Sequence, residues 1–300
     1  MRSTRARIVT EVIRVAANPD LLARAVLSRW PRASFVKRLE YDALPRPHYA
    51  YGVFHAAMEA KALGIERISA IEFGVAAGAG LAVLEQVAEQ VEKETGVAVA
   101  TYGFETTGGM PPPTDHRDMP YVWRRGLFRP RGDIRLRVPR SKLVMGDVRE
   151  TVAGFCASHN PPPLGFVAQD MDYYSSTAAA LRLFDEAHQF LLPRVFCYFD
   201  DCIGDDHELH SEFTGELAAV RQFNDSHEHR KLAPIFGLRH KRRIPAPWND
   251  VMFVAHIFDH PRYNEYTNPR WKPLRQGMAA GMTADGHGVV VAAEKAKQSC

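Results

Sequence analysis

The sequence has few cysteines and no long hydrophobic run. Its four cysteines are Cys156, Cys197, Cys202 and Cys300. No two of them have CxxC spacing, which argues against a cysteine-based zinc site. We therefore expect reduced thiols in a reducing compartment, and so a cytoplasmic protein. No segment approaches the roughly 18–20 apolar residues of a membrane span, so we expect no membrane partner.

An excess of charge of one sign is also missing. The 38 Lys and Arg residues against 35 Asp and Glu residues leave a formal net charge of +3. This charge is too small to indicate a nucleic-acid partner, and we expect none. The 46% of hydrophobic residues is typical of a globular protein and suffices for one large core.

Internal repeats are absent, and apolar runs alternate with helical patterns instead. Alternation of this kind predicts βαβ units and a parallel sheet. Strands are expected at 67–75, 98–105, 142–148, 164–172, 194–201, 231–238 and 250–258, and helices at 48–65, 80–96, 176–190 and 215–227, with a short one ending near 158. No helix separates the last two strands, so they should pair antiparallel. The predicted fold class is α/β, with a seven-stranded, mostly parallel sheet.

Three parts are expected along the chain. Residues 1–47 form an N-terminal helical extension, 48–275 the main domain with an insert at 107–140, and 276–300 a weakly ordered tail. The Arg-rich start contains Glu11 and Asp20 and shows no clear cleavage site, which favours an amphipathic helix over a transit peptide. The aromatic-rich segment 248–266 suits core packing or a subunit contact, so a homo-oligomer is one expected assembly.

A glycine turn follows the first strand in "IEFGVAAGAGLAVLE". Gly74, Gly78 and Gly80 have GxxxGxG spacing, which differs from the GxGxxG of dinucleotide folds and from a P-loop. Small residues at this point let a ligand approach the backbone closely. Glu72 stands two residues before Gly74, where its carboxylate could hold the ammonium group of a ligand.

Acids also end the next two strands. Glu105, followed by Thr106, is placed to take the hydroxyls of a ribose, and Asp147 could meet an adenine amino group. Solvated charge at strand ends is the plainer interpretation of each acid alone. Together with the glycine turn, however, the acids predict a positively charged nucleoside ligand, for which S-adenosylmethionine is the candidate.

The fourth and fifth strands end in paired acids. "QDMDYY" contains Asp170 and Asp172, and "YFDD" contains Asp200 and Asp201. Four carboxylates would repel one another in a dry cleft unless they bound a divalent cation such as Mg²⁺, or Mn²⁺ or Ca²⁺. If the strand continues to Asp172, that residue shares a face with Asp170 and could act as a base beside the metal. A solvated acidic rim is the alternative.

At these residues the chain resembles the S-adenosylmethionine-dependent O-methyltransferases of the macrocin and novobiocin-sugar type. The resemblance runs from about Tyr49 to Asn224 through "ISAIEFGVAAGAGLAVLE", "YGFETTGGMP", "LVMGDVRETV", "QDMDYYSSTAAAL" and "YFDD". It implies a Rossmann-like methyltransferase fold and cofactor contacts at Glu72, Gly74, Gly78 and Glu105. It also implies that Asp170, Asp200 and Asp201 bind Mg²⁺ and that Asp172 is the general base.

Other features allow more than one interpretation. The basic run "RHKRR" (239–243) suits a solvated loop or a substrate phosphate site. The hydroxyl residues 175–177 should cap a helix, and Trp123 and Phe128 of the insert could form a lid over the substrate. Four histidines are expected at the surface, namely His207, His210, His227 and His229.

The predicted function is metal-assisted O-methylation of a hydroxyl on a small molecule or sugar. One alternative is a metal-dependent glycosyltransferase that uses Asp170-Met171-Asp172 as a DxD motif. Another is a non-catalytic binding module on the same fold.

Overall fold

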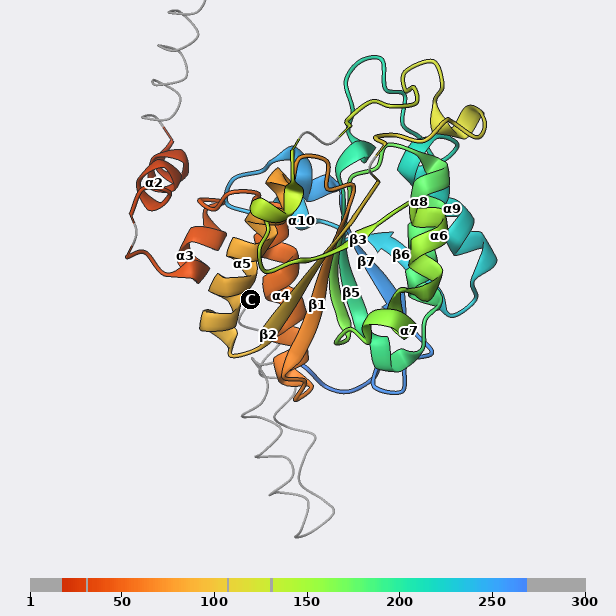
Figure 1. Cartoon of the computed structure of the whole chain (residues 1–300). Coiled ribbons are helices and arrows are strands. Elements are labelled where there is room, and N and C mark those ends of the chain that lie inside the picture. The colour runs from red at the N-terminus through yellow and green to blue at the C-terminus, as the bar shows by residue number, and fades with distance from the viewer. Residues whose placement is uncertain (1–17, 31, 107, 130–131, 269–300) are drawn as a thin grey trace, which may run out of the picture. The chain divides into compact units, whose positions relative to one another are not determined.

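A computed structural model describes residues 18–30, 32–106, 108–129 and 132–268 (Figure 1). The described residues up to Asn264 form one compact unit, and a second unit begins at Glu265. Most of the Arg-rich start (1–17) and the expected tail (276–300) lie outside the described residues. The division of the chain into three parts therefore stays a prediction.

Seven strands form one sheet in the order β3-β2-β1-β4-β5-β7-β6 (Figure 1). The strands are β1 (Arg67–Phe73), β2 (Ala98–Glu105), β3 (Lys142–Met145), β4 (Leu164–Gln169), β5 (Leu191–Phe199), β6 (Arg230–Pro234) and β7 (Met252–Ile257). The pairs among β1 to β5 are parallel, and β7 runs antiparallel to both of its neighbours. The expected mostly parallel sheet with an antiparallel last strand is confirmed.

The sequence did not indicate that β7 lies between β5 and β6. The burial of the two strands explains the order. β7 ("MFVAHI") is almost wholly buried, whereas β6 ("RKLAP") carries two basic residues and ends at Pro234. Charged residues and proline are tolerated at a sheet edge, where strand N–H groups need no partner. The more apolar strand therefore takes the interior place.

Helices cover both faces of the sheet (Figure 1). One face packs against α4 (Pro47–Ala62) and α5 (Ala79–Thr95), and the other against α6 (Val148–Thr151), α7 (Phe155–His159), α8 (Tyr174–Ala180) and α9 (Gly215–Ser226). Gly52 lets α4 lie against β4, because a Cβ there would come 2.3 Å from the Phe166 ring.

The remaining helices are α2 (Pro19–Leu27), α3 (Phe35–Glu40) and α10 (Leu238–Lys241). The 3-10 turns are η1 (His116–Asp118), η2 (Ile134–Leu136), η3 (Val152–Gly154), η4 (Leu181–Asp185), η5 (His188–Phe190), η6 (Asp200–Cys202) and η7 (Pro247–Asp250).

Several predicted elements are shorter in the structure. β4 ends at Gln169 instead of 172, because Gln169 pairs with the last residues of both neighbouring strands, Phe73 and Phe199. The helix expected over 176–190 is α8 followed by two 3-10 turns. The strand expected to reach 238 ends at Pro234, and Gly237, with φ of 72°, then leads into α10.

The basic run 239–243 lies partly in α10 and at the surface, and its three arginines pair with acids. Arg239 pairs with Asp250, Arg243 pairs with Glu40, and Arg242 pairs with Asp42. In the last pair both side chains are buried, with 10% and 3% of their surface exposed. Arg243 and Arg242 thus fasten the segment after α10 to α3 and to the chain that leads into α4, and Arg239 ties α10 to η7.

Cys156, Cys197 and Cys202 are free thiols. Across the described ranges, no helix combines the length and apolar character that a membrane span requires.

Candidate active site

A cavity of about 630 Å³ opens at the carboxyl ends of β1, β2, β4 and β5. The chain order reverses between β1 and its neighbours β2 and β4, and parallel sheets bind ligands at such a point. The cavity is lined by the glycine turn, by the ends of β2 and β3, by the insert, and by the acid-bearing segments after β4 and β5. Its volume is within the range of about 300–1,000 Å³ typical of small-molecule sites.

Two of the three predicted glycines line this cavity. Gly74 has φ of 83°, and a Cβ on it would lie 1.7 Å from the Asp170 carbonyl oxygen, so glycine allows the ends of β1 and β4 to meet. A Cβ on Gly80 would lie 2.1 Å from Glu72 Oε1. Gly78 begins α5 but does not line the cavity, and its Cβ would face Ile134. The expected cofactor contact at Gly78 stays a prediction.

Glu72 lies beneath the glycine turn with 1% of its surface exposed. Its Oε2 is buried and has no hydrogen-bond partner, and burial raises the pKa of its carboxyl to about 8 although Arg46 opposes the shift. The orphaned oxygen fits a cationic group of a ligand, because a buried acceptor without a partner is unfavourable.

Arg46 is a cavity residue that the sequence interpretation missed. It is the one basic side chain among the described residues of the lining, whose other charged members are acidic. Its guanidinium makes one hydrogen bond in the described part of the chain, donated to the Tyr49 hydroxyl at 2.9 Å. Since a guanidinium has five N–H donors, several are left for a ligand. One sequence signal for this residue was available, because Arg46 stands beside Pro47 at the start of a helix that precedes the glycine turn.

The acids that end β2 and β3 serve the local structure as well as the cavity wall. Glu105 Oε2 accepts a hydrogen bond from the Ala76 N–H at 2.5 Å and so ties the glycine turn to β2. Thr106 donates to the Gly109 carbonyl at 2.9 Å, at the start of the insert. Asp147 caps α6 and pairs with Arg149, which lowers the pKa of its carboxyl. All three of these predicted residues (Glu105, Thr106, Asp147) line the cavity.

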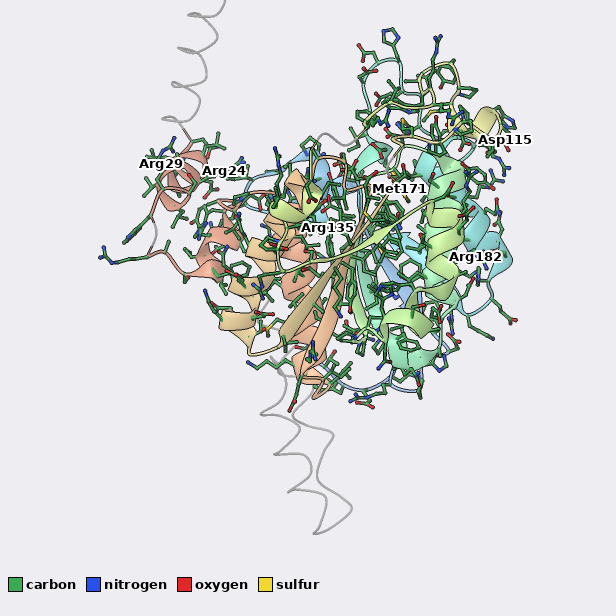
Figure 2. All side chains as sticks on the ribbon, in the orientation of Figure 1. Arg24, Arg29, Asp115, Arg135, Met171 and Arg182 are labelled. Carbon is green, nitrogen blue, oxygen red and sulfur yellow. The ribbon has the colours of Figure 1, made fainter. Side chains whose placement is uncertain are left out.

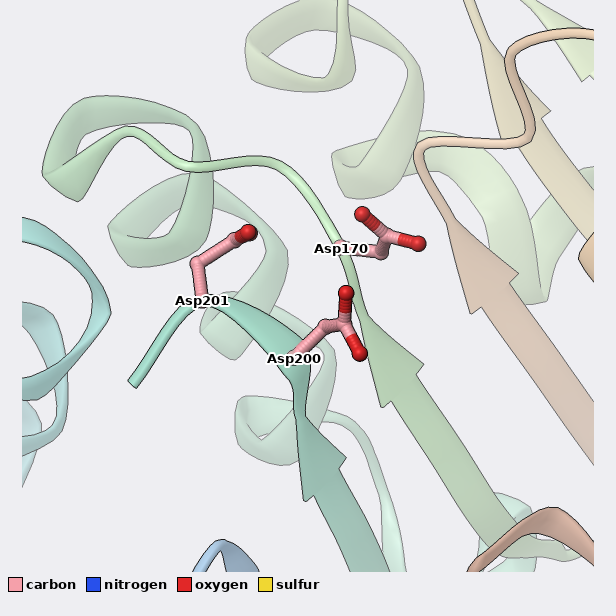
Figure 3. Close-up of side chains that lie close together, drawn as sticks. All are labelled: Asp170, Asp200 and Asp201. Carbon is pink, nitrogen blue, oxygen red and sulfur yellow. The ribbon is translucent and has the colours of Figure 1, made fainter. Parts of the chain in front are cut away.

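Asp170, Asp200 and Asp201 form one cluster at the ends of β4 and β5 (Figure 3). Each offers a carboxylate oxygen, and the three oxygens lie within 4.8 Å of one another. Asp200 accepts a hydrogen bond from the Tyr198 hydroxyl at 2.5 Å, and Asp201 accepts one from the Asp172 N–H at 2.7 Å. These contacts orient the acids and leave other oxygens for a ligand.

The protein balances the charges of this cluster only in part, through Arg46. Burial, followed by repulsion from Asp200, raises the pKa of Asp170 to about 7. Burial and Glu216 likewise raise the pKa of Asp201. Glu216, at the start of α9, is itself fully buried, and its Oε1 has no partner. Carboxylate oxygens with unbalanced charge fit a hard divalent cation such as Mg²⁺ or Mn²⁺.

Asp172 lines the same cavity but does not belong to β4. It follows the strand in a left-handed conformation with φ of 60°, which Asp tolerates better than most residues. The expectation that Asp170 and Asp172 share one face of a strand is wrong, because the pleat ends at Gln169. Burial raises the pKa of Asp172 to about 7, although a hydrogen bond with Asp201 acts to lower it.

The insert supplies one wall of the cavity. The rings of Trp123 and Phe128 lie 5.7 Å apart, and both line the cavity together with Met110. Backbone hydrogen bonds between Met110 and the 126–127 turn hold this wall in place. The expectation that Trp123 and Phe128 form a lid over the substrate stays a prediction.

Two smaller expectations are wrong. No side chain of 175–177 caps α8, whose N-cap is Tyr173; instead, Asp118 of the insert accepts from the Ser175 N–H at 2.8 Å. His210 is not at the surface, since 3% of its side chain is exposed and neither ring nitrogen has a hydrogen-bond partner. It lies next to Glu208, which lines the cavity.

The chain resembles solved structures of methyltransferases at low sequence identity. No protein-family model and no curated protein matches the chain. Among solved structures, CalS11, a calicheamicin methyltransferase, is similar at 22% identity over 79% of this chain and 90% of that one, with a TM-score of 0.49. The O-methyltransferase NovP is similar at 11% identity over 80% and 90% of the two chains, with a TM-score of 0.45. An O-methyltransferase from Bacillus cereus in complex with SAH is similar at 11% identity over 78% and 96%, with a TM-score of 0.35.

The predicted Rossmann-like methyltransferase fold is confirmed. The strand order and the antiparallel β7 carry this conclusion. Because these identities and TM-scores are low, the reaction that the protein catalyses has to be inferred from the residues that line the cavity.

The raised pKa values predict how pH and metal change stability. Asp170 and Asp172 have pKa values of about 7 in the folded protein against 3.8 ordinarily. The folded protein therefore binds more protons than the unfolded chain between about pH 4 and pH 7. In EDTA, the contribution of these groups to stability should be fully present below pH 4 and lost as the pH rises through 7.

Mg²⁺ should reverse the part of that loss that comes from Asp170, because a cation bound by the three clustered aspartates competes with protons for the Asp170 carboxylate. At 100 times its Kd, we expect Mg²⁺ to raise Tm at pH 8 by about 5–10 °C and much less at pH 5. Differential scanning calorimetry at both pH values checks this. An equal Mg²⁺ effect at pH 5 and pH 8 would argue against binding at these acids. As a control, Asp225→Asn, at an exposed position on α9, should respond to Mg²⁺ as the wild type does.

Proposed function

We propose that the protein is an S-adenosylmethionine-dependent methyltransferase that methylates a hydroxyl of a small molecule or sugar with the help of a divalent cation. One observation carries the proposal. A single cavity joins a glycine turn, with Glu72 and Arg46 beside it, to a cluster of three aspartates. A cofactor and an acceptor can therefore meet within it.

The glycine-turn side suits the amino-acid end of the cofactor. The orphaned Glu72 Oε2 would accept from the ammonium group, and the free N–H groups of Arg46 would donate to the carboxylate. Gly74 and Gly80 allow close approach to the backbone there. Glu105 would take the ribose hydroxyls through its remaining oxygen, and Asp147 stands where the base would lie.

The aspartate side suits the acceptor. Asp170, Asp200 and Asp201 would hold Mg²⁺, which when bound lowers the pKa of a coordinated hydroxyl. Asp172 would receive the proton that the acceptor hydroxyl loses as its oxygen bonds to the methyl carbon and the carbon–sulfur bond breaks. Trp123 and Phe128 would face the apolar part of the acceptor and exclude water.

The alternatives are less well supported. A glycosyltransferase with a DxD motif would place Asp170 and Asp172 together on the cation, yet the cluster joins Asp170 to Asp200 and Asp201 of the next strand. A binding module without catalysis would not require a separate buried acid, Asp172, beside the cluster.

Calorimetric titration with S-adenosylhomocysteine tests the proposal. The wild-type protein should bind it and should not bind UDP-sugars. Arg46→Met should weaken S-adenosylhomocysteine binding by about 10- to 100-fold, because a charge-assisted hydrogen bond contributes about 1.5–3 kcal/mol. The same variant should bind 5′-methylthioadenosine, which has no carboxylate, as the wild type does.

Arg182→Met is the matched control, since Arg182 lies on the outer side of α8 and α9 (Figure 2). Absence of S-adenosylhomocysteine binding to the wild type would refute the proposed function. An equal loss for both ligands in Arg46→Met would refute only the role given to Arg46.

A further inference from the structure

Asp118 is a fully buried carboxylate in the insert, far in sequence from the acids of the cavity. Its Oδ1 accepts from the Ser175 N–H at 2.8 Å. Its Oδ2 accepts from the Ser175 hydroxyl at 2.8 Å and from both the N–H and the hydroxyl of Thr114 at 2.7 Å. The carboxylate therefore has four donors, two of them from a residue 57 positions away. Such charge-assisted bonds are the strong ones in a protein interior.

These bonds supply the cap that α8 lacks. The first N–H groups of a helix have no partner within the helix, and the N-cap Tyr173 offers no side-chain acceptor. Asp118 takes this place from the insert, and its negative charge suits the start of a helix. The start of α8 is thus fixed by a residue outside its own neighbourhood in sequence.

The segment between β4 and α8 contains both kinds of acid that the proposed reaction needs. It begins at Asp170, whose N–H donates to the Phe73 carbonyl at 3.1 Å, and it passes through Asp172. It ends at Tyr173, and Asp118 holds Ser175 in the first turn of α8 that follows. Asp172 has a left-handed backbone, so its position depends on support at both ends of this short segment.

The same turn of the insert also carries the aromatic wall. Met119, which follows Asp118, is fully buried, and its carbonyl accepts from the Trp123 N–H at 3.0 Å. Arg117, which precedes Asp118, lies 3.7 Å from the centre of the Tyr174 ring. One turn therefore joins the cavity wall at Trp123 to the segment that presents Asp172.

We propose that Asp118 is a positioning residue that couples the docked insert to Asp172. This inference rests on the proposed function. In this proposal the insert is a fixed wall of the cavity. When the acceptor binds against Trp123, Asp172 is already directed at the acceptor hydroxyl. Asp118 touches neither the cofactor nor the acceptor and acts through Ser175 and the 170–173 segment.

The first test needs no acceptor. Hydrogen–deuterium exchange compares the wild type with Asp118→Asn, which keeps the side-chain shape but places an NH₂ group against the donors of Thr114 or Ser175. Exchange should become faster in 119–128 and in 170–177 together. Asp225→Asn is the control, because Asp225 is an aspartate on the surface of α9 with 74% of its side chain exposed. Unchanged exchange at 170–177 in Asp118→Asn overturns the proposal.

The second test separates positioning from a general structural effect. Tritiated S-adenosylmethionine and a series of glycosides and phenols serve as probes for transfer. Asp118→Asn should lower kcat by about 10- to 100-fold, as small misplacements of a reacting group do. S-adenosylhomocysteine affinity should change by less than about twofold, because the glycine turn is not touched.

In an Asp172→Asn background, Asp118→Asn should cost less than about a further twofold, since the group that it positions is gone. An equal loss in both backgrounds overturns the coupling. If the wild type transfers no methyl group to any probe, the proposed function is in question, while the exchange comparison still decides whether Asp118 positions 170–177.

Discussion

Asp172→Asn should lower kcat by about 10²–10⁴-fold, the usual contribution of a positioned general base. The acceptor hydroxyl must lose its proton as it attacks the methyl group, and Asp172 is the buried cavity acid that stands beside the metal cluster without belonging to it. Asn also tolerates the left-handed backbone at this position, so the change removes basicity and little else. S-adenosylhomocysteine affinity should stay within about twofold.

Single-turnover transfer of a tritiated methyl group to an acceptor that the wild type accepts measures this loss. Asp206→Asn is the matched control, because Asp206 is an exposed acid near the cavity that does not line it. Near-normal kcat in Asp172→Asn would move the role of base elsewhere, and the buried His210 would be the next residue to test.

Removal of divalent cations should lower turnover by about 100-fold or more, and Mg²⁺ should restore it. Three carboxylates within 4.8 Å of one another repel when no cation lies between them, and the acceptor hydroxyl then keeps its ordinary pKa. Asp170→Asn and Asp200→Asn should both raise the Mg²⁺ concentration that half-maximal activity needs, whereas Asp172→Asn should leave it nearly unchanged.

Turnover assays in EDTA, with Mg²⁺ added back, check this expectation. Full activity in excess EDTA would show that the cation has no part in the reaction, although the protein could still be a methyltransferase. The metal and the cofactor are thus tested separately.

The sheet and most acids of the site could be predicted from sequence because both follow from local patterns. Apolar runs of strand length gave β1 to β5, and parallel strands bring their carboxyl ends to one edge, so Asp170 had to lie near Asp200. The position of Asp172 could not be predicted from the alternation of strand residues. The strand stops where its neighbours stop, which depends on the register of β1 and β5.

Other parts of the site depend on contacts across long sequence distances. Arg46 faces Glu72 only because α4 packs beside β1, and its place beside Pro47 indicates a helix start but not this packing. Asp118 caps α8 from 57 positions away, and the hydroxyl-rich start of that helix suggested a local cap instead. The place of β7 between β5 and β6 follows from comparing the burial of two strands, which requires the sheet as a whole.

The central claim is that one cavity holds the cofactor and the metal side by side. A crystal grown with S-adenosylhomocysteine and Mn²⁺, measured at a wavelength where manganese scatters anomalously, tests it most directly. The account predicts one anomalous peak bonded to oxygens of Asp170, Asp200 and Asp201, with the ligand along the glycine turn and its amino-acid end between Glu72 and Arg46. A manganese peak elsewhere, or a ligand bound outside this cavity, would contradict it.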